Sequence, residues 1–71
     1  MLFYQINVSL NGQHFFETDI NSIPNKATME KVYKVFKEKF PIEEGYDILV
    51  WDMVGKFVDT NYLNDDVTDN N

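Results

Sequence analysis

The chain has 71 residues, no cysteine, one histidine, and six lysines against twelve acids, which gives a net charge of −6. One small domain is expected at this length, and the lack of cysteine excludes disulfides, a thiolate nucleophile and cysteine-type zinc sites. No apolar run approaches the roughly 20 residues that span a bilayer, so we expect a soluble cytoplasmic protein that does not associate with membranes.

The amino-terminal segment predicts a β-hairpin. In residues 2–10 the even positions are apolar and most odd positions are polar, which is typical of a strand with one buried face. Asn11-Gly12 follows at once and favours a two-residue type I′ turn. Residues 13–19 are therefore expected to return antiparallel to the first strand.

The register of this hairpin decides where two adjacent phenylalanines point. With a two-residue loop, Val8 pairs with Phe15 on the buried face, and Phe16 lies across from Asn7 on the other face. A three-residue loop exchanges the two phenylalanines, because a slip of one residue inverts every side chain. In either register, one phenylalanine is expected on the outer face of the sheet.

An amphipathic helix is predicted after a polar connector at residues 21–26. Asn25 or Thr28 is expected to cap a helix that begins near Ala27. The apolar side chains then recur at helical spacing, at Met29, Val32, Tyr33, Phe36 and Phe40. The helix must end by residue 40, because Pro41 disfavours the helical conformation for its predecessor and has no amide donor.

The carboxyl-terminal half predicts a second hairpin. After an acidic connector at residues 43–45, residues 46–51 are apolar on both sides, which places this strand inside the sheet or packed on both faces. Val54-Gly55 marks a tight turn, and residues 56–62 are expected to return as the last strand.

The predicted architecture is α+β, of ββαββ type, with one helix packed across one face of a four-stranded sheet. Val50 is expected opposite Val58 in the second hairpin. One domain covers residues 1–62. Residues 63–71 carry too little apolar surface to offset the entropy of ordering them, and are expected to form a flexible acidic tail.

Two short motifs resemble the immunoglobulin-binding domain of streptococcal protein G: residues 27–34, Ala-Thr-Met-Glu-Lys-Val-Tyr-Lys, and Leu10-Asn11-Gly12 in the first turn. That family has the β-grasp fold, in which the helix crosses a four-stranded sheet whose first and last strands are central and parallel. The resemblance implies the same strand order here. It also implies an Fc-contacting helix surface on Glu30, Lys31 and Lys34.

The residues offer little for catalysis. His14 is the single imidazole, and Ser9 lies across the predicted hairpin from it, where we expect a solvent-facing pair. Glu43 and Glu44 are adjacent in an exposed connector and lack the burial that acid–base catalysis by paired carboxylates requires. We therefore expect no catalytic residue and no enzymatic activity.

Metal and cofactor binding are not expected either. The tail aspartates are hard oxygen ligands, but the tail lacks the turn glycine and the terminal bidentate glutamate of an EF-hand loop. The three residues concerned are Asp65, Asp66 and Asp69.

Charge is distributed unevenly along the chain. Residues 1–25 carry −2, residues 26–40 carry +3 and residues 41–71 carry −7. An acidic surface beside exposed aromatic rings is typical of a site that steers and anchors a basic partner, including one built to hold nucleic acid. Direct nucleic-acid binding is not expected, because phosphates would be repelled. The predicted partner-binding residues are Glu43, Glu44, Asp47, Trp51, Asp52, Phe57 and Asp59.

These features predict a small acidic non-enzymatic protein-binding module. The absence of arginine, the abundance of asparagine and the small size suit a compact, AT-rich mobile genome, so the leading hypothesis is a phage-type inhibitor of a host or defence protein, acting in the host cytoplasm as a nucleic-acid mimic. The alternatives are a β-grasp immunoglobulin-type binder and a small subunit or adaptor of a larger assembly. The exposed aromatic residues fit a homodimer interface equally well.

Overall fold

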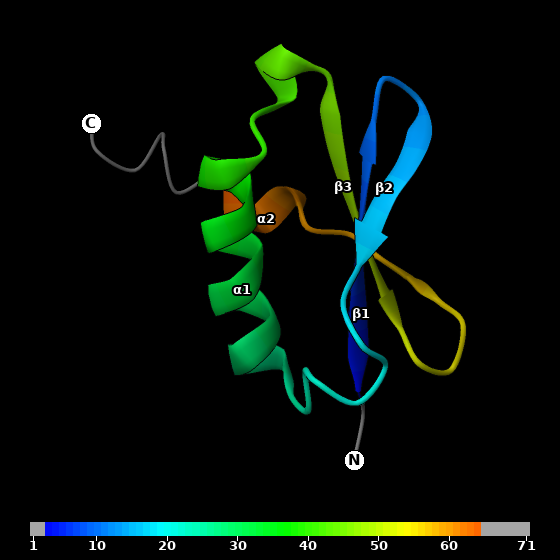
Figure 1. The fold of residues 1–71 in the computed structure, drawn as a ribbon. Helices are drawn as coiled ribbons and strands as arrows, with labels where there is room; N and C mark the ends of the chain where they lie inside the picture. Colours follow the sequence, from blue (N-terminus) through cyan, green and yellow to red (C-terminus); the bar gives the residue numbers. More distant parts are fainter. Residues whose placement is uncertain (1–2, 65–71) are drawn as a thin grey trace, which may run out of the picture.

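The computed structural model describes residues 3–64, which fold into a four-stranded sheet with one long helix across one face (Figure 1). The strands are β1 (Tyr4–Leu10), β2 (Gln13–Glu17), β3 (Tyr46–Asp52) and β4 (Phe57–Val58). The helices are α1 (Lys26–Lys39), the 3-10 turn η1 (Ile42–Glu44) and the single turn α2 (Asn61–Asn64). The predicted α+β class and ββαββ arrangement are confirmed.

The strand order is β2-β1-β3-β4, with antiparallel pairing throughout. The order implied by the protein G resemblance, with the first and last strands central and parallel, is therefore wrong. The physical reason is strand length. β1 and β3 pair along seven residues, whereas a two-residue β4 beside β1 would leave most backbone groups of that central strand unpaired. Because β2 and β3 both oppose β1, they run in the same direction, and α1 supplies the crossover between them.

The first hairpin has the predicted turn but an unpredicted bulge. Asn11 and Gly12 both have positive φ, at 54° and 85°, as a type I′ turn requires. Beyond the turn the register shifts, so that Val8 lies opposite Phe16 and Phe15 is the extra residue. The predicted pairing of Val8 with Phe15 is wrong, and Glu17, not Phe16, lies across from Asn7.

The bulge turns both phenylalanines toward the helix side of the sheet. Phe16 lies with its ring centroid 5.5 Å from Phe36 and 5.4 Å from Phe40, while Phe15 lies 6.0 Å from Phe40 and 5.7 Å from Tyr46. We call these five rings the aromatic cluster. The expectation that one of the two phenylalanines lies on the outer face is therefore wrong, although Phe15 keeps about half of its surface exposed.

Helix α1 begins and ends as predicted. The Asn25 side chain accepts a hydrogen bond from the Thr28 amide at 2.8 Å, and the last backbone bond runs from Phe40 N–H to Phe36 O, just before Pro41. Its apolar stripe packs on β1 and β3 to form the core. The buried core residues are Tyr4, Ile6, Ile23, Met29, Tyr33, Val50 and Leu63, with Val32, Phe36, Ile48 and Val58 packed against them.

The last strand is much shorter than predicted. Val50 does lie opposite Val58, but the strand expected at residues 56–62 ends at Val58, and the chain turns back toward α1 as α2 (Figure 1). The Asp59 Oδ1 accepts from the amide of Asn61, the first residue of α2, at 2.9 Å, and this local bond favours a helical turn over a longer strand. Leu63, which the sequence placed in the tail, is buried in the core. The remaining tail, with its three aspartates, lies outside the described residues.

Candidate protein-binding surface

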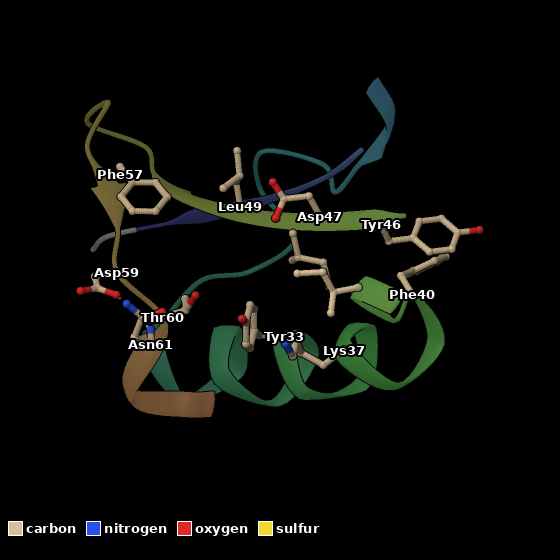
Figure 2. A pocket seen from close by; sticks show the side chains of 12 residues that line it. Tyr33, Lys37, Phe40, Tyr46, Asp47, Leu49, Phe57, Asp59, Thr60 and Asn61 are labelled. Carbon is tan, nitrogen blue, oxygen red and sulfur yellow. Dashed lines mark hydrogen bonds between the residues drawn. The ribbon is translucent and has the colours of Figure 1, made fainter. Parts of the chain in front are cut away.

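The face of the sheet opposite α1 has no covering layer within residues 3–64 (Figure 1). Successive side chains of a strand point to opposite faces. Since Ile48 and Val50 pack toward the helix, the alternate residues of β3 point away from it. Those residues are Asp47, Leu49 and Trp51, and Figure 2 shows Asp47 and Leu49 projecting from β3 on the side away from α1. We call this side the open face.

Three large apolar side chains lie together on the open face. Trp51 pairs across the sheet with Phe57, and their rings meet edge to face with centroids 5.8 Å apart. Leu49 lies two residues from Trp51 on the same strand. The exposed fractions are 37% for Leu49, 37% for Trp51 and 54% for Phe57, so folding leaves much of this surface in water. We call these three residues the open-face patch.

Two of the predicted acids lie near this patch. Asp47 is on the open face two residues before Leu49, and it has no hydrogen-bond or ion-pair partner within residues 3–64. Asp59 follows β4 closely, is exposed, and uses one carboxylate oxygen to cap α2. Asp47 therefore keeps its charge available to a partner, whereas Asp59 is partly engaged.

The other predicted acids lie elsewhere. The Asp52 carboxylate accepts hydrogen bonds from the Val54 and Lys56 amides at 3.1 and 3.0 Å, so it holds the turn of the second hairpin. Glu43 and Glu44 belong to η1, before the start of β3. At about 3.3 Å per residue, β3 extends roughly 16 Å from Tyr46 to Trp51, so both glutamates lie beyond the end of the strand that is distant from the patch.

A cleft of about 500 Å³ lies between α1 and the first half of β3. In Figure 2, Tyr33 and Lys37 line it from α1, Tyr46 from β3 and Thr60 from the segment after β4. Sequence reasoning missed this cleft, because it exists only where β4 stops early. The signal that would have revealed it is the capping role of Asp59.

Within residues 3–64, the groups considered for catalysis show no assembled centre. Ser9 does pair with His14 across the hairpin, but the imidazole lies beside Glu17, with Nε2 3.5 Å from Oε1, and both side chains are exposed. Within residues 3–64 no three metal-ligating side chains lie together. The tail aspartates considered for metal binding lie outside this part of the chain.

A separate polar contact ties α2 to α1. The Tyr62 hydroxyl donates to Glu30 Oε2 at 2.7 Å, and the Lys26 amine lies 5.3 Å from the centre of the Tyr62 ring. Burial, together with the hydrogen bond and the negative charge of Glu30, raises the pKa of Tyr62 to about 12. Glu30, which the protein G resemblance places on a partner-contacting surface, is thus engaged within the molecule.

Comparison of the chain with models of known protein families, with curated protein sequences and with solved structures finds no match. Among the described residues, no helix has both the length and the apolar character needed to cross a membrane.

Proposed function

We propose that this protein is a small non-enzymatic protein-binding module whose partner contacts the open-face patch. The observation that carries the proposal is the clustering of Leu49, Trp51 and Phe57 on the face that no segment of residues 3–64 covers. Aromatic side chains in such a patch supply most of the binding energy in many protein interfaces. We therefore expect most of the affinity to come from these three residues.

Charge supports a basic partner. The chain carries −6, and Asp47 lies unpaired on the same face as the patch. Such carboxylates attract a basic surface over a Debye length of about 10 Å at 0.1 M salt. We further propose that the partner site is one that holds nucleic acid, and that the protein is a phage-type inhibitor of a host or defence protein. The arginine-free, asparagine-rich composition supports this finer proposal.

Affinity capture from a bacterial lysate with matched baits tests the proposal. The baits are the native chain, a Trp51→Ser/Phe57→Ser double variant, and Val35→Ser as a control. Val35 lies on α1 and is 47% exposed, so its replacement removes exposed apolar surface away from the patch. We expect a protein that is retained by the native and control baits and lost by the double variant, with all three baits folded by circular dichroism. Equal capture by all three baits would contradict the proposal.

The same baits separate the alternative functions. A partner lost by Lys31→Glu but retained by the double variant would indicate a helix-face binder of the immunoglobulin type. A concentration-dependent dimer in sedimentation, abolished in the double variant, would indicate that a second copy covers the patch. If the captured protein binds nucleic acid, the native chain should displace a fluorescent duplex from it. Failure to displace the duplex would contradict the proposal of a nucleic-acid mimic, while the proposal of a protein-binding module would still stand.

A further inference from the structure

The first half of β3 has an unpaired backbone edge. The Met53 amide donates to Phe3 O on the β1 side, and the Asp52 amide donates to Lys56 O on the β4 side. Backbone groups alternate along a strand, so the odd residues of β3 bond to β1 and the even residues face β4. Tyr46 and Ile48 therefore direct their N–H and C=O groups toward the β4 side.

Strand β4 does not reach these groups. It pairs only with Val50 and Trp51, and the chain then leaves the sheet as α2. Within residues 3–64 no other segment pairs with the β4 side of Tyr46 and Ile48. In the described part of the chain, the N–H and C=O groups of Tyr46 and Ile48 thus remain available, and such an edge is a template for one more short strand.

The cleft lies along this edge. Residues 46–49 of β3 line one wall, and Tyr33 and Lys37 of α1 line the opposite wall (Figure 2). The free volume of about 500 Å³ is of the size that binding sites for small ligands and short peptide segments require. The cleft therefore occupies the place that a longer β4 would have taken beside β3.

Charge and register specify what fits there. The residue of an added strand that lies directly opposite Asp47 shares its face, which is the open face. Its neighbours on either side point into the cleft, where Ile48 and Tyr33 supply apolar surface and the Lys37 side chain lies on the α1 wall. The Asp47 carboxylate has no partner within residues 3–64. The complementary segment thus has a basic residue opposite Asp47 and an apolar residue on each side of it.

We propose that a partner protein inserts an extended segment with alternating apolar and basic residues into this cleft, where it adds as a strand to β3 beside Tyr46 and Ile48. This mode of binding rests on the proposed function, and it adds that the partner binds through an extended segment. The basic side chain meets Asp47 at the border of the open-face patch. One continuous surface then takes both the added strand and the rest of the partner.

Methylation of a single backbone nitrogen tests the added strand. A chain of 71 residues is accessible to chemical synthesis, and N-methyl Ile48 removes the outward donor and blocks the edge without changing a side chain. The matched control is N-methyl Glu17. The Thr18 amide bonds inward to Ile6 O, so the Glu17 amide points outward from the opposite edge of the sheet. Thermal unfolding of both proteins confirms that each is folded.

The probe is the capped peptide Val-Lys-Val-Lys-Val carrying a fluorophore, with Val-Glu-Val-Glu-Val as its control. We expect anisotropy to show binding of the lysine peptide only, with affinity lowered about tenfold or more by N-methyl Ile48 and unchanged by N-methyl Glu17. Asp47→Lys should reverse the preference between the two peptides. Absence of binding by the native chain, or equal binding by the two methylated chains, would overturn the proposal.

The captured partner separates this proposal from the proposed function. If N-methyl Ile48 retains the partner fully while the Trp51→Ser/Phe57→Ser variant loses it, the open-face patch binds the partner without an added strand, and the inference fails alone. If both variants retain the partner fully, the proposed function fails as well. Loss of the partner by both variants supports both proposals.

Discussion

Replacing Phe40 with alanine tests the aromatic cluster that the bulge creates. The Phe40 ring lies 5.2 Å from Tyr46, 5.4 Å from Phe16, 5.6 Å from Phe36 and 6.0 Å from Phe15, centroid to centroid. Truncating a packed phenylalanine costs about 3–5 kcal/mol, and we expect about 3 kcal/mol because Phe40 is only partly buried. A loss of that size lowers the melting temperature of a small domain by about 12–24 °C.

Urea unfolding followed by circular dichroism measures this loss. The matched control is Phe57→Ala, which removes an exposed ring whose one aromatic neighbour among the described residues is Trp51, and it should cost less than about 1 kcal/mol. Phe40→Leu keeps part of the apolar volume and should fall between the two. If Phe40→Ala is no more destabilising than Phe57→Ala, the cluster does not hold the first hairpin to the helix and the bulged register is wrong.

Two further predictions concern the turn before β3 and the contact between the two helices. Gly45→Ala should destabilise the fold by about 1–2 kcal/mol or more, because φ is 98° and the new Cβ would meet the Asn11 side chain. Gly55→Ala, at the same φ but in open space, should cost only the backbone strain. Equal urea midpoints for the two variants would refute the predicted clash with Asn11. Because the pKa of Tyr62 is raised to about 12 from an ordinary 10 by burial and by Glu30, the stability that its neutral form contributes is complete below pH 10 and lost as the pH rises toward 12. Tyr62→Phe should flatten the dependence of the unfolding midpoint on pH in that window, and an unchanged slope would refute the contact.

Local patterns in the sequence predicted most of the elements. Asn11-Gly12 has few alternatives to a tight turn with positive φ, and Asn25 and Pro41 bound the helix by the chemistry of their own backbone and side chains. The Val54-Gly55 turn likewise placed Val50 opposite Val58. These features depend on neighbours within a few residues, which a single sequence displays directly.

The features that sequence analysis missed depend on competition between distant segments. The bulge at Phe15 allows both phenylalanine rings to pack against the end of α1. No local sequence pattern indicates this stabilising contact. Where β4 ends, the hydrogen bond from the Asn61 amide to Asp59 and the burial of Leu63 take the place of further strand pairing. The candidate cleft also exists because β4 ends early. The open-face aromatic residues were predicted from composition, while their position beside Asp47 needed the strand register.

The most direct test of a protein-binding open face is the kinetics of the captured partner at two ionic strengths. Trp51→Ala should raise the dissociation rate constant by about tenfold or more, with little change for Val35→Ala, because anchoring residues act mainly on dissociation. Asp47→Lys should slow association and flatten its dependence on salt. Glu43→Lys makes the same change of charge on η1, farther along the chain from the patch, and should do so less. Unchanged rates for Trp51→Ala and Asp47→Lys, with binding abolished by Lys31→Glu, would contradict the account and place the partner on the helix.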